Sequence, residues 1–554
     1  MPSKDRKQFN ARIKELETIR QPHDGPNKDI RDYQAPNRGN FIEDKGKEGQ
    51  RMDLKIYDGT PALSARQFGA GMNSRITSPS RPWFRLATAN RDLMERADVK
   101  AYLSGVEEKM YQIFNQSNFY SQAALFYHEM GVFGTAVMSI VEDTKDLVLF
   151  DTYTVGEYYI ATNHRGVIDV LYRRIWMTPT QLIEKFGKDK VSQTVLDMLK
   201  DRPSAKVKVI HVVEPNDERI PNMIDAKNKA YRSVYYEEES TEKDREFLRV
   251  SGFGTFPYVV ARWATNGSDP YGTDQPGRLA LGDSKQLQSN TFEKAKGLQR
   301  NMNPPLQGPS DLKNARIGNI PGGFTFVNRF GGDQGGIRPL YEVRVPLGDI
   351  IQDNQEVQQR IRQAYFVDLF LSILSNSRPQ DMKSEVAFQI DQERLLQLGP
   401  VLESVNDEFL DPAIDRVFDI AEARGVFPEA PEDLKNEELR PEYVSALAKA
   451  QKTAAISSME RMASFAGSLE AIMPGTIDKL DGDQMVDEAS EILDVPSGIV
   501  RSDDEVKVVR DAKAAAVQQQ RNLEMGVAAA GAAKDLASAP VGKGTLIDTL
   551  TGSP

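Results

Sequence analysis

The chain has 554 residues, which is too many for one hydrophobic core and indicates two to four structural units. It has no cysteine, so disulfide bonds, thiol catalysis and cysteine-based metal sites are excluded. The net charge of −11 predicts that any contact with DNA is loose or made through local basic patches, because a tight sequence-independent grip needs a basic face.

No segment has the length and apolar character of a membrane-spanning helix or a signal peptide. The N-terminus is polar, and the longest apolar run, residues 364–374, is interrupted by Asp368 and Ser372. A membrane-spanning helix needs roughly 20 apolar residues. We therefore expect a soluble protein with no membrane partner.

The N-terminal region is expected to form two helices joined by a polar segment. Residues 5–20 have the spacing of an amphipathic helix, through Phe9, Ile13, Leu16 and Ile19. This helix is expected to end at the breakers that follow, Pro22, Gly25 and Pro26, so that residues 21–50 form a long surface segment.

A second helix is expected over residues 62–75, with Thr60 as its cap and Pro61 in its first turn. Two glycines within it, Gly69 and Gly71, indicate close packing against another element. The aromatic pair Trp83 and Phe84 is expected to be buried.

The middle of the chain changes from helical to strand-like spacing. Residues 91–132 have a helical pattern that Gly131 and Gly134 are expected to stop, and residues 136–175 read as short strands and turns. Thr178 and Pro179 begin a short helix that ends at Gly187. Further strands are expected over the ranges 206–213 and 258–263, with a hairpin in 216–245.

Long helices dominate after residue 279. Helices over 279–302 and 349–374 enclose a glycine-rich insertion, residues 303–346, and a polar loop, residues 375–384, follows. A third helical stretch is kinked at Gly399-Pro400 and restarted at Asp411-Pro412 before it ends near Gly425. More helices are expected over the ranges 441–473, 483–494 and 503–537.

The two helices around the insertion favour an oligomer. A helix of about 24 residues spans about 36 Å, and in a free subunit this pair is expected to be poorly covered. Side-by-side packing in a ring covers its apolar positions, so Leu298 and Ile361 are the candidate packing residues.

The sequence has no recognisable catalytic motif. The nearest approach to a phosphate-binding loop, residues 541–545, lacks the upstream glycine, and the glycine-rich stretch 331–336 is not followed by a helix. The four histidines are too far apart for a local metal pair, and no cluster of acidic residues and histidine resembles a two-metal nuclease site. We therefore expect no enzyme activity, no metal and no cofactor.

Charge is unevenly distributed around the helix pair. Residues 271–345 hold ten basic and six acidic residues, a net of +4, whereas residues 346–425 hold seven and fifteen, a net of −8. One interpretation is a basic docking tip beside an acidic conduit that repels the DNA backbone. The other, with equal weight, is chance asymmetry.

Several short motifs, in this order and spacing, resemble those of the head-to-tail connector (portal) proteins of short-tailed, T7-like bacteriophages. The similarity covers about residues 5–510. The N-terminal motifs are Tyr57-Asp58-Gly59-Thr60, Ala70-Gly71-Met72-Asn73-Ser74, Pro82-Trp83-Phe84 and Phe133-Gly134-Thr135-Ala136. The central and later motifs are Arg262-Trp263, Pro270-Tyr271-Gly272, Pro276-Gly277, Ala280-Leu281 with Asp283, Asn303-Pro304-Pro305, Leu398-Gly399-Pro400-Val401, and Phe409-Leu410 with Pro412.

The resemblance implies an α+β, mainly helical portal fold assembled as a dodecameric ring around a channel. It implies a wing (1–278 and the kinked helix 385–425), stem helices (279–302 and 347–374), a clip (303–346), a tunnel loop (375–384) and a crown (426–554). The implied DNA-facing residues are Ser375, Asn376, Arg378 and Lys383. The clip residues that the resemblance brings near the terminase, the tail or DNA are Lys313, Arg316 and Arg329.

The same resemblance implies a structural role in the virion, at the capsid vertex through which DNA is packaged and ejected. The implied partners are further copies of the chain, double-stranded DNA, the terminase large subunit, a tail adaptor, and the scaffold and major capsid proteins, with assembly in the host cytoplasm. The alternatives are another ring component such as a tail adaptor, which is usually much smaller, or a DNA-translocating enzyme, against which the missing motifs argue.

Overall fold

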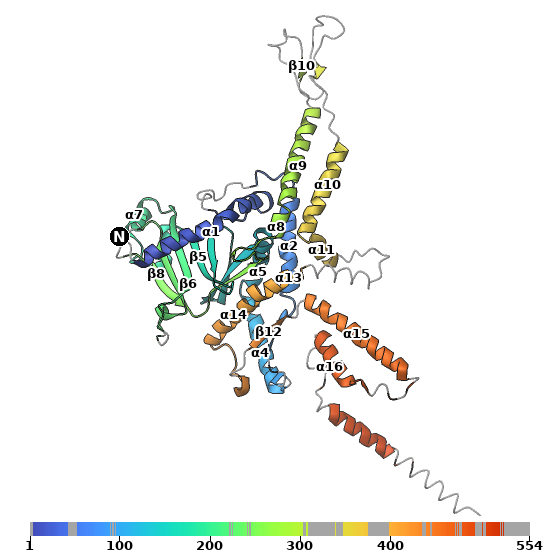
Figure 1. The fold of residues 1–554 in the computed structure, drawn as a ribbon. Coiled ribbons are helices and arrows are strands. Elements are labelled where there is room, and N and C mark those ends of the chain that lie inside the picture. The colour runs from blue at the N-terminus through green and yellow to red at the C-terminus, as the bar shows by residue number, and fades with distance from the viewer. Residues whose placement is uncertain are drawn as a thin grey trace, which may run out of the picture. The chain divides into compact units, whose positions relative to one another are not determined.

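A computed structural model describes residues 4–41, 53–88, 96–220, 225–240, 245–302, 347–374, 398–434, 439–443, 446–470, 479–493 and 506–520, with a few isolated residues between these ranges. The chain forms two compact units, residues 1–448 and 449–554. The fold is mixed and mainly helical, as the sequence predicts (Figure 1).

A five-stranded antiparallel sheet is the largest sheet of the first unit, in the order β4-β5-β6-β7-β8. Two short helices, α6 (Pro179–Phe186) and α7 (Gln193–Asp201), connect β5 to β6. The predicted cap of α6 is confirmed, because Thr178 Oγ1 accepts from the Gln181 amide at 3.3 Å and Gln181 Oε1 accepts from the Thr178 amide at 2.9 Å. The strands are β4 (Tyr158–Thr162), β5 (Ile168–Met177), β6 (Val207–Pro215), β7 (Tyr231–Glu237) and β8 (Arg249–Phe253).

A second antiparallel sheet of three strands joins the β-rich part to the helices. Its order is β3 (Leu147–Tyr153), β2 (Thr135–Asp143) and β9 (Tyr258–Arg262). The predicted strands in this region are therefore confirmed. The helix α5 (Phe119–Phe133) leads directly into β2 through Gly134, whose φ of 82° is a left-handed conformation that favours glycine.

The first helix is longer than the sequence predicts. α1 spans Lys4–Gln34 and includes Pro22 and Pro26, so the expected end at residue 20 and the surface segment from residue 21 are wrong. Each proline removes a helical hydrogen bond, which costs about 3 kcal/mol, but contacts fix the helix on both sides of them. Phe9, Ile13 and Leu16 pack on the five-stranded sheet, and Ile30 enters the main core.

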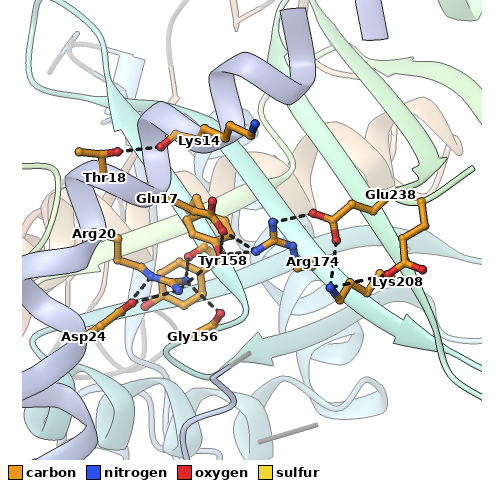
Figure 2. A network of polar contacts seen from close by, with 12 residues as sticks. Lys14, Glu17, Thr18, Arg20, Asp24, Gly156, Tyr158, Arg174, Lys208 and Glu238 are labelled. Carbon is orange, nitrogen blue, oxygen red and sulfur yellow. Dashed lines mark hydrogen bonds and ion pairs between the residues drawn. The ribbon is translucent and has the colours of Figure 1, made fainter. Parts of the chain in front are cut away.

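The same helix is bound to the sheet by a polar network, which Figure 2 shows from close by. Arg20 donates to the carbonyls of Gly156 and Tyr158, each at 2.9 Å, and contacts Asp24 at 3.0 Å. Arg174 on β5 bridges Glu17 of α1 and Glu238 beyond β7, at 2.6 and 2.7 Å. Ile19 is 41% exposed, so it does not lie on the buried face of α1 that the sequence predicts for it.

The main core lies among helices. α2 (Thr60–Ile76) packs against α5, and Trp83 and Phe84 are both buried, as predicted. The helical pattern of 91–132 is two helices, α4 (Ala97–Gln116) and α5, because the chain turns at residues 117–118. Gly131 lies inside α5, where its missing side chain makes room for the Phe68 ring, so the expectation that it stops the helix is wrong.

The restart of the helix expected at Asp411-Pro412 is instead a turn of π-helix within a continuous run. α13 (Gly399–Val405) runs through η5, a π-helical turn over Asn406–Leu410, into α14 (Asp411–Ala423). Pro412 has no amide hydrogen and its ring would clash with the carbonyl four residues earlier. The wider π-turn moves that carbonyl away, so the helix bends without a restart.

The residues after α14 return to the N-terminal half of the first unit. β12 (Leu439–Tyr443) pairs antiparallel with β1 (Phe84–Thr88), and Tyr443 donates to Asp411. The helix expected over 441–473 therefore begins later, at α15 (Ala446–Glu470). The second unit contains most of α15, then α16 (Gly482–Leu493) and helical residues 506–520, close to the predicted ranges.

Candidate functional site: the helix pair and its base

Two helices that enclose residues 303–346 lie side by side (Figure 1). α9 spans Leu281–Met302 and α10 spans Leu347–Ala364, so they are about 33 and 27 Å long. Their polar contacts show that they are antiparallel. Arg360 near the end of α10 pairs with Asp283 at the start of α9 at 2.9 Å, and Asn290 donates to Asp353 at 2.6 Å.

The helix pair is well covered at its base and exposed toward the insertion. Leu287, Val357 and Ile361 are fully buried within one chain, whereas Leu298 is half-buried and Met302 is exposed. The expectation that a free subunit leaves the pair poorly covered is therefore wrong for Ile361, because α2 and its neighbours already cover that end. A role for Leu298 and Ile361 in contacts between subunits stays a prediction.

Hydrogen bonds hold the turn at Tyr57 and Asp58 against the base of the helix pair. The side-chain oxygen of Gln288 accepts from the amides of Tyr57 and Asp58 at 2.6 and 2.8 Å, and its nitrogen donates to the Asp58 carbonyl at 2.8 Å. From α10, Gln358 donates to the Asp58 carboxylate at 2.7 Å. Asp58 also accepts from the Thr60 amide at 2.8 Å, and the N-cap position of α2 is Gly59, which has no side chain to cap the helix, so the predicted cap, Thr60, is wrong.

A second connection joins the base of the pair to the end of α1. Gln34 is buried, donates to the Gly277 carbonyl at 2.8 Å and accepts from the hydroxyl of Tyr365. Gly277 belongs to the short helix α8 (Pro276–Leu279), which packs so closely on α5 that a side chain there would overlap the Val132 carbonyl. Burial raises the pKa of Tyr365, so its hydroxyl stays protonated and donating.

The helix expected over 349–374 is broken just after Tyr365. Phe366 has a φ of 54°, which is unusual for a residue with a bulky side chain, and α11 (Val367–Leu374) starts beyond it. The Phe366 ring stacks on Trp263, with ring centres 6.4 Å apart, and Phe370 of α11 packs against Gly71 of α2. Trp263 and Gly71, both in the motifs noted above, therefore set the direction in which the chain leaves the helix pair.

The predicted DNA-facing residues follow α11 directly but lie outside the described residues, namely Ser375, Asn376, Arg378 and Lys383. The predicted clip residues Lys313, Arg316 and Arg329 also lie outside them. Within the insertion, the described residues are a two-residue strand pair, β10 (Leu306–Gln307) with β11 (Arg338–Pro339). Sequence reasoning did not single out Gln34 and Gln288, whose side-chain amides bind the base of the helix pair but belong to no spacing pattern.

The parts of the chain that the structure describes contain no group of three or more His, Asp or Glu residues that could hold a metal ion. No helix among them is long and apolar enough to span a membrane.

Comparisons with known proteins show the family of the chain. Residues 6–500 match the family described as bacteriophage head to tail connecting protein. The chain is 39% identical to the portal protein of Salmonella phage epsilon15, over 92% of this chain and 91% of that one. It is 36% identical to a probable portal protein of Bordetella phage BPP-1, over 94% of each chain. The chain therefore belongs to the bacteriophage head-to-tail connecting protein family.

Proposed function

We propose that the chain is the subunit of a portal ring at one capsid vertex, through which genomic DNA is packaged and later ejected. The observation that carries the proposal is the antiparallel pair α9–α10, which is anchored at its base by Gln288 and Gln34 and exposed toward residues 303–346. Near full-length similarity to portal proteins supports the same role.

In this proposal the helix pair is the stem, residues 303–346 are the clip and residues 375–384 form a tunnel loop facing DNA. The β-rich region with α1, α13 and α14 is the wing. The crown, assigned to residues 426–554 from the resemblance, is proposed to begin later, near residue 449, because residues 439–443 pair with β1 in the first compact unit. The ring is a dodecamer that docks the terminase large subunit through Lys313, Arg316 and Arg329, and later the tail adaptor. It assembles with scaffold and major capsid proteins in the host cytoplasm, and works as a structural component without enzyme activity.

Negative-stain images of the purified protein test the ring, and in vitro packaging tests the conduit. Rings with a central channel are expected, together with no ATP hydrolysis by the chain alone. Replacing Arg378 and Lys383 together by alanine is expected to leave rings intact and to change the amount of DNA packaged. A protein that stays monomeric at high concentration with its scaffold protein present contradicts the ring. Unchanged packaging by the double variant contradicts the role of the loop.

A further inference from the structure

A groove with an acidic rim lies where α13, η5 and α14 cross the ends of both sheets. Its volume is about 670 Å³, and it is lined by the turn 163–169, residues 255–262 and one side of the helices 400–419. Six carboxylates and three arginines line it, a net charge of −3. The carboxylates are Asp169, Glu403, Asp407, Glu408, Asp415 and Asp419, and the arginines are Arg165, Arg262 and Arg416.

Two of these arginines already serve contacts within the chain. Arg262 pairs with Glu408, and its amide donates to the same carboxylate at 2.8 Å. Arg416 donates to the carbonyls of Ile140 and Thr255, each at 3.3 Å. Glu403 and Asp407 are exposed on the rim and make no ion pair with any residue that the structure describes. The rim therefore keeps its negative charge toward solvent.

The groove also has apolar walls, so it is more than a cluster of charges. Val259, Val260 and two prolines, Pro400 and Pro412, line it, and Val167 at its mouth is 57% exposed. Apolar walls and a charged rim are the composition of a protein interface, in which the charges select the partner and the apolar centre excludes water.

A basic lobe lies elsewhere on the same unit. It consists of residues 179–206, which contain α6 and α7, and it holds six cations and four anions, a net of +2 in a chain of net −11. All ten charged side chains are exposed. The cations are Lys185, Lys188, Lys190, Lys200, Arg202 and Lys206, and the anions are Glu184, Asp189, Asp197 and Asp201.

The groove and the lobe lie at opposite ends of the five-stranded sheet. The groove includes Ile168, where β5 begins, and Tyr231, which pairs with Pro215 at the end of β6. The lobe follows Met177 at the end of β5 and precedes Val207 at the start of β6. β5 has ten residues, so about 33 Å of sheet separates the two surfaces.

We propose that the acidic groove of one subunit receives the basic lobe of the neighbouring copy of this chain. A closed ring uses a heterologous interface, in which two different surfaces of each subunit meet. The acidic groove and the basic lobe, at opposite ends of one sheet, supply such a pair of surfaces. Each copy then places its lobe in the groove of one neighbour and receives the lobe of the other neighbour in its own groove. This inference rests on the proposed ring and adds the surfaces that build it.

Charge reversal on each surface tests the pairing. The groove variant carries Glu403→Lys and Asp407→Lys, and the lobe variant carries Lys188→Glu and Lys190→Glu. Each is expected to raise the concentration for half-maximal ring assembly by about tenfold or more, because like charges then face each other. All four changes in one chain are expected to restore assembly. The matched control carries Glu108→Lys and Glu460→Lys, which are exposed and outside both surfaces, and is expected to assemble as the wild type does.

Analytical ultracentrifugation and negative-stain imaging of the full chain measure assembly, and circular dichroism melting checks that each variant is folded. If both single-surface variants are folded and still form rings as the wild type does, the proposed pairing is wrong and the proposed function stands. Failure of the fourfold variant, with both single-surface variants folded, also overturns it. A wild-type chain that forms no ring removes the proposed function itself, so the two failures are distinguishable.

Discussion

At the scale of single residues, glycine marks the closest approaches between helices. A side chain at Gly71 of α2 would overlap the ring of Phe370, although Gly71 lies in an ordinary helical segment. The expectation from the sequence, that Gly69 and Gly71 indicate close packing, is confirmed by this contact and by His128, whose Cβ lies 2.9 Å from a Cβ built on Gly69.

Replacing Gly71 by alanine is expected to destabilise the subunit by about 1–3 kcal/mol, because the overlap outweighs the better helix propensity of alanine. The matched control is Gly105→Ala in α4, where no atom lies within 4 Å of the new Cβ and a gain of up to about 1 kcal/mol is expected. Urea denaturation gives both free energies of unfolding. Equal stabilisation by the two changes would remove the packing argument.

A second residue-scale prediction concerns pH. Burial, with the charges of Arg38 and Arg66, lowers the pKa of His128 to about 4. Between about pH 6.5 and 4, His128 is therefore protonated in the unfolded chain, where the histidine pKa is near 6.5, but neutral in the folded chain. Stability is complete above this window and is lost as pH falls through it.

The loss of stability assigned to His128 is at most about 3–4 kcal/mol, since one pKa unit corresponds to about 1.4 kcal/mol. Melting temperatures of the wild type and of His128→Gln, measured from pH 7 to 4, are expected to converge or cross toward pH 4, because the variant does not titrate at this position. His164→Gln, on an exposed turn, is the control. A constant difference between wild type and His128→Gln over this range would contradict the assignment.

At the scale of elements, the break between α10 and α11 carries backbone strain. Phe366 has a φ of 54°, and such a left-handed conformation costs about 1–2 kcal/mol for a residue other than glycine. Packing compensates for it, through the Trp263 ring against Phe366 and the neighbouring Tyr365, which is bound to Gln34. The break therefore depends on tertiary contacts and not on a local helix-stop signal.

Comparison of Phe366→Gly with Phe366→Ala separates strain from packing. Both variants lose the ring, but only glycine relieves the left-handed conformation, so the glycine variant is expected to be more stable by about 1 kcal/mol. In a regular helix alanine is more stable by about the same amount. Thermal melting of the two proteins measures the order, and a more stable alanine variant would show that the chain is helical there.

Elements with a local signal are the ones that the sequence predicted. The capped helix α6, the strands β2 to β6 and the helices α9 and α10 follow from spacing, caps and turns. Two features depend on contacts between distant residues, namely α1 beyond Pro22 and the pairing of β12 with β1. No window of sequence contains both partners of such contacts, so periodicity did not predict them.

The sequence predicted the outline of the candidate site but not the hydrogen bonds that hold it in place. The helix pair and its insertion follow from periodicity and from Asn303-Pro304-Pro305, but the amides of Gln34 and Gln288 resemble any surface glutamine in the sequence. Only the folded chain brings Gln288 to the turn at Tyr57 and Gln34 to Tyr365.

At the scale of the whole molecule, substitutions at Leu298 and Ile361 are expected to affect ring assembly and subunit folding, respectively. Ile361→Asp places a charge in the core of one chain and is expected to destabilise the subunit on the order of 4 kcal/mol. Leu298 is half-buried, so Leu298→Asp is expected to keep the melting temperature within a few degrees and to prevent ring formation. Melting curves and negative-stain images distinguish these outcomes. Normal rings from Leu298→Asp would remove the stem from the interface between subunits.

The pairing of β1 with β12 has a consequence for synthesis of the chain. The strand β1 (residues 84–88) cannot pair until residues 439–443 have been synthesised. At about 5–20 residues per second, a ribosome adds those residues roughly 20–70 s after β1. During that interval the hydrogen-bonding groups of β1 have no strand partner, and closing so long a loop is slow. The first unit can therefore be completed, and assembly can start, only when about four fifths of the chain has been translated.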